Sequence, residues 1–311
     1  MPKTLPIDFS TTLDTSNLKD KSVLITGGAS GIGLAGATAV ASAGAFVTIV
    51  DLQEELGIAV AKELSFQGYK VQFVQTDVTS YESQTAAFKS AIEFGGGKID
   101  IVIPSAGIIA EKNLLDMVAG TEPSLDSVPP VPSFSGVEVN LKGVYYTCYL
   151  ALYYFKLPEP EDTAPFKKAI ILIASVAGYL GYPSSTTYSI SKFGVRGILH
   201  GIRAKAAEQT PQIRINLIAP WFVKTPMTVD PSKPDAESLM RAGRMYGFAP
   251  MENVVDAIMR FSVNEKTTGR AALIMPDGNV DLEDDIWGGY GGPVMQQQMG
   301  TALERIIKEM K

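Results

Sequence analysis

The sequence predicts an α/β fold, with a single doubly wound parallel β-sheet of about seven strands and helices on both of its faces. Two observations lead to this prediction. Short runs rich in β-branched residues recur along the chain, and helical patterns separate them. Nearly all of these runs are continuously apolar, which is typical of strands that are buried on both faces of a parallel sheet.

The expected elements alternate regularly along the chain. The strand-like runs are 22–26, 45–51, 70–77, 99–107, 168–175, 213–220 and 271–278. The helical patterns between them are 31–44, 53–67, 80–94, 133–156, 186–209 and 250–263. No low-complexity linker or internal repeat divides them, so we expect one domain over 21–280 after an N-terminal extension over 1–20. A tail follows over 281–311, and a helix is expected there from the spacing of Met295, Met299, Leu303, Ile306 and Met310.

Three segments interrupt the alternation of strand and helix. Residues 118–134 are rich in proline, residues 157–165 form a polar excursion, and residues 221–250 mix methionine and aromatic residues with prolines. In a doubly wound sheet, ligands bind beyond the carboxyl ends of the strands, where such loops lie. We therefore expect 221–250 to be a substrate loop. All three segments are candidates for a lid, and an ordinary packed insertion explains the first two equally well.

Charge and composition exclude several classes of function. The 311 residues carry a net charge of −6 and no basic block, unlike a nucleic-acid-binding protein. The one cysteine, Cys148, lies in an apolar aromatic run, so we expect a buried, inert thiol in a reducing compartment. The one histidine, His200, has no cysteine cluster or second histidine to complete a zinc site, so no metal is expected. Because no signal peptide or apolar run of membrane-spanning length is present, we expect a cytoplasmic protein.

The stretch TGGASGIGLAG (26–36) fits two glycine patterns. Gly31, Gly33 and Gly36 form G-x-G-x-x-G, whereas Thr26, Gly27, Gly31 and Gly33 form T-G-x-x-x-G-x-G. Because the first expected strand ends at Thr26, the longer pattern is the one correctly placed, and Gly36 is expected to pack within the helix. Glycines let backbone N–H groups approach a pyrophosphate at the positive end of a helix. The loop therefore predicts a dinucleotide site.

Acidic residues end the second and third expected strands. Asp51 can accept hydrogen bonds from an adenosine ribose and would repel a 2′-phosphate. Neither Ser30 nor Leu52 supplies a cation for that phosphate, so we predict NAD(H) in preference to NADP(H). Asp77 could bind the adenine amino group. Each acid taken alone is equally explained as a turn or helix-cap residue.

Four polar residues could carry a reaction. Tyr188 and Lys192 are four residues apart in an expected helix and so share a face. A nearby ammonium lowers a phenol pKa, which would let Tyr188 exchange a proton with an alcohol or carbonyl. Ser175 closes the fifth strand and could bind the reacting oxygen. Asn140, among apolar neighbours, needs a buried partner such as a water.

Together these motifs resemble the classical short-chain dehydrogenases/reductases over residues 20–280. The matching motifs are TGGASGIG (26–33), Asp51, DV (77–78), SAG (105–107), Asn140, Ser175, YSISK (188–192) and IAP…KTP (218–226). The resemblance implies a Rossmann-type domain and direct hydride transfer to or from a nicotinamide. It also implies a homodimer or homotetramer assembled through the helices at 133–156 and 186–209.

The resemblance implies a role for each matching residue. Tyr188 is then the acid/base, Lys192 tunes it and holds the nicotinamide ribose, and Ser175 orients the substrate oxygen. Asn140 holds a water in the proton relay, and Thr225 binds the nicotinamide carboxamide. The expected cofactor contacts are Gly27, Ser30, Gly31, Ile32, Gly33, Asp51, Leu52, Asp77, Val78, Ala106, Gly107, Tyr188, Lys192, Pro220, Val223 and Thr225.

Two positions depart from the family pattern. The usual N-N-A-G is Pro104-Ser105-Ala106-Gly107 here, which removes the asparagine side chains near the adenosine. The usual P-G is Pro220-Trp221, which places an indole at the substrate edge. The acidic end of the second strand and the closing pattern over 268–284 are most similar to 15-hydroxyprostaglandin-dehydrogenase-like members.

The sequence therefore predicts an NAD(H)-dependent oxidoreductase that interconverts a secondary alcohol and a ketone on a lipophilic or ring-bearing small molecule. Tyr179, Tyr182, Trp221 and Phe222 are expected to wall its substrate pocket beside Ser175, although an aromatic residue is more often part of a core. One alternative is a biosynthetic enzyme of the same fold that cyclises or isomerises its substrate. A non-catalytic nucleotide sensor is disfavoured because all four catalytic positions are present.

Overall fold

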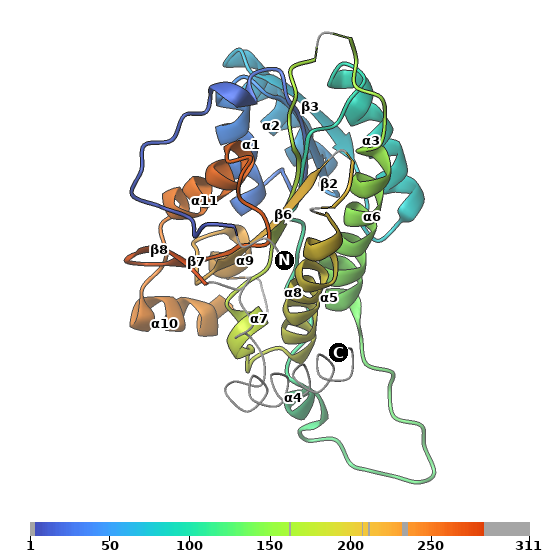
Figure 1. The fold of residues 1–311 in the computed structure, drawn as a ribbon. Coiled ribbons are helices and arrows are strands. Elements are labelled where there is room, and N and C mark those ends of the chain that lie inside the picture. Colours follow the sequence, from blue (N-terminus) through green and yellow to red (C-terminus); the bar gives the residue numbers. More distant parts are fainter. Residues whose placement is uncertain (1–3, 162, 207, 211, 232–235, 283–311) are drawn as a thin grey trace, which may run out of the picture.

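The computed structural model describes residues 4–161, 163–206, 208–210, 212–231 and 236–282. Its centre is an eight-stranded sheet in the order β3-β2-β1-β4-β5-β6-β7-β8 (Figure 1). The strands are β1 (Ser22–Thr26), β2 (Phe46–Asp51), β3 (Lys70–Gln75), β4 (Ile101–Pro104), β5 (Lys168–Ile173), β6 (Ile213–Pro220), β7 (Ala271–Met275) and β8 (Gly278–Asp281). The first seven are parallel, and β8 pairs antiparallel with β7. The predicted doubly wound α/β fold is confirmed.

Helices of different lengths connect and cover these strands. The α-helices are α1 (Gly31–Ser42), α2 (Glu54–Phe66), α3 (Tyr81–Phe94), α4 (Leu114–Val118), α5 (Ser135–Val137), α6 (Val144–Tyr154), α7 (Ala177–Leu180), α8 (Thr186–Ala206), α9 (Pro226–Val229), α10 (Ala236–Tyr246) and α11 (Met251–Val263). A 3-10 helix, η1 (Ser16–Leu18), precedes β1, and a π-helix, η2 (Glu138–Gly143), joins α5 to α6.

Apolar side chains on both faces of the sheet pack against the two helical layers. In β1, Val23 and Ile25 pack in one core cluster with residues of α1, α2 and α11. Leu24, which points to the opposite face, packs with residues of α3, α6 and α8. Helices cover both faces of the sheet (Figure 1). Successive side chains of a strand point to opposite faces, so a continuously apolar strand packs against helices on both sides. This explains why the strands lack alternation.

Two elements differ from the sequence prediction. The run 271–278 was predicted as one strand, but β7 ends at Met275 and an eighth strand follows a turn. β8 has the polar sequence GNVD, and Asp281 forms an ion pair with the buried Arg270 at 2.6 Å. The predicted helix over 133–156 is present as one helical run over 135–154, but its middle is the π-helix η2, which widens the turns around Asn140.

The three interrupting segments differ in structure. Every residue from 119 to 135 is exposed, and this exposed arm extends away from the rest of the protein between α4 and α5 (Figure 1). Residues 221–250 instead contain α9 and α10, and a β-bridge between Val223 and Ala249 closes the base of this segment. Glu159 of the segment 157–165 forms an ion pair with Lys168.

The N-terminal extension is hydrogen-bonded to the rest of the protein. The Arg260 guanidinium donates hydrogen bonds to the backbone carbonyls of Asp8, Phe9 and Thr11, at 2.8 to 3.1 Å, and so ties the N-terminal extension to α11. The helix predicted in the C-terminal tail lies in 283–311, outside the described residues. Among the described helices, none combines the length and the apolar character that a membrane crossing requires.

Cys148 lies inside α6 with 1% of its surface exposed. Burial raises the pKa of its thiol to about 12, so the thiolate does not form near neutral pH. The prediction of a buried, inert cysteine is confirmed. His200 lies in α8, as the sequence predicted.

Candidate active site

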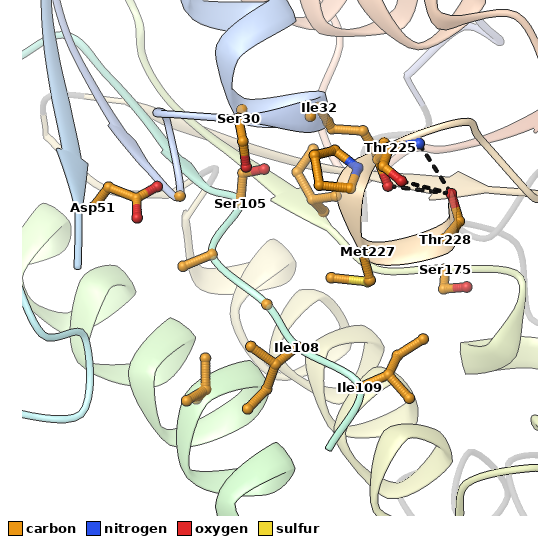
Figure 2. A pocket seen from close by; sticks show the side chains of 18 of the residues that line it. Ser30, Ile32, Asp51, Ser105, Ile108, Ile109, Ser175, Thr225, Met227 and Thr228 are labelled. Carbon is orange, nitrogen blue, oxygen red and sulfur yellow. Dashed lines mark hydrogen bonds between the residues drawn. The ribbon is translucent and has the colours of Figure 1, made fainter. Parts of the chain in front are cut away.

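A cavity of about 600 Å³ lies at the carboxyl ends of the strands. Figure 2 shows Asp51 at one end of this cavity and Ser175 at the other, with the chain from Ser105 to Ile109 running between them. Every residue that the sequence assigned to the cofactor lines the cavity, from Gly27 to Thr225. The fold thus brings together predicted cofactor residues from six separate stretches of the chain.

The glycine loop between β1 and α1 forms one wall. Gly27 and Gly31 have φ angles of +65° and +54°, which favour glycine. A Cβ on Gly27 would lie 2.6 Å from the Cα of Ala106, and one on Gly33 would lie 2.1 Å from the carbonyl oxygen of Gly27. Gly36 is different, because its missing Cβ makes room for Ile258 of α11 at 3.0 Å. The helix-packing role predicted for Gly36 is therefore confirmed.

The Asp51 carboxylate fastens this loop to β2. It is 8% exposed and accepts hydrogen bonds from the N–H groups of Ala29 and Gln53, both at 3.1 Å. Asp77 accepts from the N–H and the hydroxyl of Thr79, at 2.8 and 2.7 Å, in the turn before α3. Both acids therefore accept backbone hydrogen bonds in turns, and both also line the cavity.

The segment after β4 closes the middle of the cavity. The N–H groups of Ser105 and Ala106 donate to the hydroxyl of Thr26, both at 3.0 Å, which joins the ends of β1 and β4. A Cβ on Gly107 would lie 3.3 Å from Oδ1 of Asn140. The close backbone approach therefore does not depend on the asparagines that the family usually has here.

Asn140 is fully buried behind this segment. Its Oδ1 accepts from the N–H of Ile108 at 2.7 Å, and its Nδ2 donates to the carbonyl of Ile108 at 2.8 Å and to the Ser191 hydroxyl at 3.3 Å. The buried partner expected for this asparagine is thus protein backbone and a serine. The π-helix η2 carries Asn140 and sets its position against the chain after β4.

Tyr188 and Lys192 lie one turn apart on α8. The Lys192 ammonium is 5.5 Å from the centroid of the Tyr188 ring and donates to the carbonyl of Ile173 at 3.1 Å. Burial lowers the pKa of Lys192 to about 8. Burial also raises the pKa of Tyr188 to about 12, against the opposing effect of its hydrogen bond with Ser175, while Tyr182 raises it further. The lowered tyrosine pKa expected from the sequence is therefore wrong for this structure, because desolvation of the buried phenol outweighs the lowering effect of its hydrogen bond with Ser175.

Ser175 follows β5 at the reaction end of the cavity. Its hydroxyl accepts from the N–H of Ala177 at 3.1 Å, lies 3.5 Å from the carbonyl of Pro220, and hydrogen-bonds the Tyr188 side chain. Because Ser175 and Tyr188 meet at one point of the cavity, a single substrate oxygen could contact both.

Apolar side chains surround this reaction end. Ile108, Ile109, Trp221 and Met227 line the cavity near Ser175, and Figure 2 shows Met227 between the two isoleucines and the loop of Thr225 and Thr228. Ile108 and Ile109 were not among the predicted site residues, although they directly follow the S-A-G motif. Met227 directly follows the K-T-P motif, which was the signal that could have singled it out.

The aromatic residues predicted for the substrate lie in different places. Trp221 lines the cavity, whereas Tyr179 stacks on the Arg196 guanidinium at 3.8 Å. The Tyr182 ring contacts the Tyr188 ring edge-to-face at 5.7 Å, and Phe222 contacts Trp221 at 5.0 Å. Tyr182 and Phe222 therefore support the residues that line the cavity, and Tyr179 belongs to the packing around α8.

The charges along the cavity are unevenly distributed. Among the described residues that line it, Lys192 is the only cation, at the reaction end, and the acids are Asp51, Asp77 and Asp230. In the part of the chain that the structure describes, no arginine or lysine lines the cavity beside Asp51. The described residues also contain no group of three or more histidine, cysteine or acidic side chains that could hold a metal ion.

Comparisons with known proteins agree with this arrangement. A model of the short chain dehydrogenase family matches residues 21–235. The 5'-hydroxyaverantin dehydrogenase of Dothistroma septosporum is 43% identical over 305 residues, which cover 95% of this chain and 99% of that protein. A 5'-hydroxyaverantin dehydrogenase of Emericella nidulans is 40% identical over 314 residues, covering 96% and 99%. An NADP-dependent dehydrogenase of a Phoma species is 34% identical over 293 residues, covering 91% and 85%.

Proposed function

The chain belongs to the short-chain dehydrogenase family, and from this premise we propose an NAD(H)-dependent oxidoreductase that interconverts a secondary alcohol and a ketone on a lipophilic, ring-bearing small molecule. The observation that carries the proposal is the meeting of Ser175, Tyr188 and Lys192 at the apolar end of a cavity whose other wall is a glycine loop. Two relatives are named as dehydrogenases of a hydroxy compound, which supports a reaction between an alcohol and a ketone.

The glycine wall fits a dinucleotide. Positions 27 and 33 leave no room for a Cβ, so backbone forms the surface there and N–H groups can approach a pyrophosphate. In the described structure, no side-chain hydrogen bond caps the first turn of α1. When bound, the nicotinamide cofactor accepts or supplies the hydride.

The preference for NAD(H) rests on Asp51 and on the lack of a lining cation beside it among the described residues. A buried carboxylate favours ribose hydroxyls and repels a 2′-phosphate. Two relatives at 34% and 35% identity are named NADP-dependent, so the cofactor is a property to measure on this chain.

On the reaction side, Tyr188 exchanges the proton of the substrate oxygen and Ser175 holds that oxygen in place. With a raised pKa, the phenol of Tyr188 keeps its proton at neutral pH, which suits donation to a ketone. Oxidation requires the phenolate, so the rate of alcohol oxidation is expected to rise with pH. Lys192 lines the same cavity and donates to the Ile173 carbonyl, which supports a contact of its ammonium with the nicotinamide ribose.

The substrate proposal rests on the apolar lining formed by Ile108, Ile109, Trp221 and Met227. Such a lining binds rings and alkyl groups and leaves hydrogen bonding to Ser175 and Tyr188. Because two relatives are named 5'-hydroxyaverantin dehydrogenases, this compound is the first candidate to test.

We also propose a homodimer or homotetramer. Tyr145, Tyr149 and Tyr153 of α6 are each more than half exposed, and their spacing places them along one side of the helix. Such a row of exposed aromatic side chains suits contact with a second copy of this chain. A cytoplasmic location and a likeness to the 15-hydroxyprostaglandin-dehydrogenase-like members remain predictions from the sequence.

The function can be tested in two steps. Titration with NADH and NADPH, followed by fluorescence, gives the two affinities, and NADH is expected to bind more tightly. Purified protein is then mixed with NAD+ or NADP+ and 5'-hydroxyaverantin or other lipophilic secondary alcohols, and nicotinamide absorbance is followed. A product that forms without any change in that absorbance would favour the cyclisation or isomerisation alternative. Absence of turnover with every alcohol and ketone would contradict the proposal.

A further inference from the structure

Glu111 is a buried acid that the proposed reaction does not use. It lies between β4 and α4 and is 6% exposed. Its Oε1 accepts from the hydroxyls of Ser133 and Ser135, both at 2.7 Å, and its Oε2 accepts from the hydroxyl of Thr187 at 2.7 Å. The N–H of Gly136 donates to both oxygens, at 3.1 and 3.2 Å. One carboxylate thus connects three segments that are distant in the sequence.

Each of these three segments continues into a residue that lines the cavity, namely Ile109, Val139 and Tyr188. Glu111 is two residues after the cavity-lining Ile109 in the chain. Ser133 and Ser135 end the exposed arm where it meets α5, and Thr187 is in the first turn of α8. The fit around the carboxylate is tight, since a Cβ on Gly136 would lie 2.6 Å from Oε2.

A directed chain of hydrogen bonds leads from Glu111 to Tyr188. The Thr187 hydroxyl donates its one proton to Glu111. In the 3.3 Å contact between the hydroxyls of Ser185 and Thr187, Ser185 must therefore donate and Thr187 must accept. Ser185 in turn accepts from the N–H of Tyr188 at 3.2 Å. Ser185 is fully buried and Thr187 is 7% exposed, so water does not readily replace either partner.

The direction of this chain depends on the charge of Glu111. Burial disfavours the carboxylate, but the hydrogen bonds from Thr187, Ser133, Ser135 and Gly136 outweigh it and lower the pKa of Glu111 to about 2. At neutral pH the group is therefore an obligate acceptor. It orients both hydroxyls and, through them, the first turn of α8.

We propose that Glu111 is a positioning residue, which fixes the first turn of α8 through Thr187 and Ser185 and thereby holds Tyr188 against the cavity wall formed by Ile108 and Ile109. This inference rests on the proposed role of Tyr188. A small displacement of an acid/base group changes turnover more than binding, because proton transfer requires close geometry.

The test compares four variants of the full-length protein. Thr187→Val removes the hydroxyl that links Glu111 to Ser185 while keeping a β-branched side chain, and Thr187→Ser restores the hydroxyl. Glu111→Gln removes the charge. Glu138→Gln is the matched control, because Glu138 is a half-exposed acid of η2 that pairs with Lys142 at the surface.

Thr187→Val and Glu111→Gln are expected to lower kcat for alcohol oxidation by about tenfold or more, with KM and NADH affinity changed much less. Thr187→Ser is expected to recover most of kcat, and Glu138→Gln to match the wild type. Both positions lie on one chain of hydrogen bonds. The fold-decrease in kcat of the double variant Glu111→Gln/Thr187→Val should therefore be smaller than the product of the two single fold-decreases.

A second readout does not depend on turnover. Hydrogen exchange, measured by mass spectrometry, should speed up in the peptide that covers 185–190 in Thr187→Val and Glu111→Gln, and stay unchanged in the peptide of α1. If the wild type turns over no alcohol but this exchange pattern appears, the proposed function fails and the positioning link stands. Wild-type kcat and exchange in both variants would overturn the positioning role. A fall in kcat that Thr187→Ser does not recover, together with an equal loss of NADH affinity, would also overturn it.

Discussion

On the β1–β2 side of the cavity, the wall is mostly backbone, because Gly27, Gly31 and Gly33 remove the side chains that would otherwise fill it. On the side of β5 and α8, the wall consists of side chains. Tyr188 and Lys192 reach the cavity there beside Ser175, and hydrogen bonds across the fold hold the surrounding segments. The two sides face the same space but are built in opposite ways.

This difference separates two kinds of dependence. The backbone wall comes from a stretch of seven residues, so its shape follows from local sequence. The side-chain wall depends on contacts such as Asn140 with Ile108 and Glu111 with Thr187, which are 32 and 76 residues apart. We therefore expect changes on the first side to alter cofactor affinity and changes on the second side to alter turnover.

The largest effect is expected for Tyr188→Phe on the side-chain wall. Loss of the phenol proton should lower kcat by about 10²- to 10⁴-fold, since general acid/base catalysis contributes that much. Affinity for NADH, measured by titration, should change little. Tyr69→Phe is the matched control, because Tyr69 precedes β3 at the opposite edge of the sheet. Turnover retained by Tyr188→Phe would remove the acid/base assignment.

Gly33→Ala tests the backbone wall. The added Cβ would lie 2.1 Å from the carbonyl oxygen of Gly27, so the loop must move. We expect NADH to bind at least about tenfold more weakly, equivalent to about 1.4 kcal/mol. Gly201→Ala in α8 is the control, because nothing lies within 4 Å of its Cβ and alanine should stabilise the helix by about 0.5–1 kcal/mol. Equal NADH affinity in Gly33→Ala and the wild type would show that this loop does not hold the cofactor.

Asp51→Ser tests what the backbone wall selects. Removing the carboxylate removes the repulsion of a 2′-phosphate, so the ratio of NADPH to NADH affinity should rise by about tenfold. Asp77→Asn is the comparison, since it should affect both cofactors alike and leave the ratio unchanged. If parallel titrations show an unchanged ratio in Asp51→Ser, Asp51 does not determine the preference for NAD(H).

The last prediction concerns stability in acid, which affects folding and not cofactor binding or turnover. The folded pKa of Glu111 is about 2, below its ordinary value of 4.5, so the unfolded chain binds more protons between these values. The stabilisation is therefore complete above about pH 4.5 and is lost as pH falls through about 2, by up to about 3 kcal/mol. Urea unfolding at pH 5 and pH 3 should show the stability gap between wild type and Glu111→Gln shrinking. A constant gap would contradict the low pKa.

The seven parallel strands and the predicted cofactor contacts, all of which line the cavity, could be identified because each rests on a local pattern. The apolar runs indicated the seven parallel strands, and the glycine loop could be placed from the strand that ends at Thr26. β8 was missed because its polar sequence has no strand pattern and depends on pairing with β7. The π-helix around Asn140 was missed because it differs from an α-helix in hydrogen bonding, which the hydrophobic pattern does not show.

By itself, the sequence determined the class of sheet, the backbone wall around Gly27, Gly31 and Gly33, and the shared helix face of Tyr188 and Lys192. These follow from chain stereochemistry and residue spacing, which act over a few residues. The tertiary structure alone decided the pKa of Tyr188, the packing position of Tyr179 and the link from Glu111 to α8. Each of these depends on burial or on partners far away in the chain, and desolvation and hydrogen-bond geometry are set when the segments pack together.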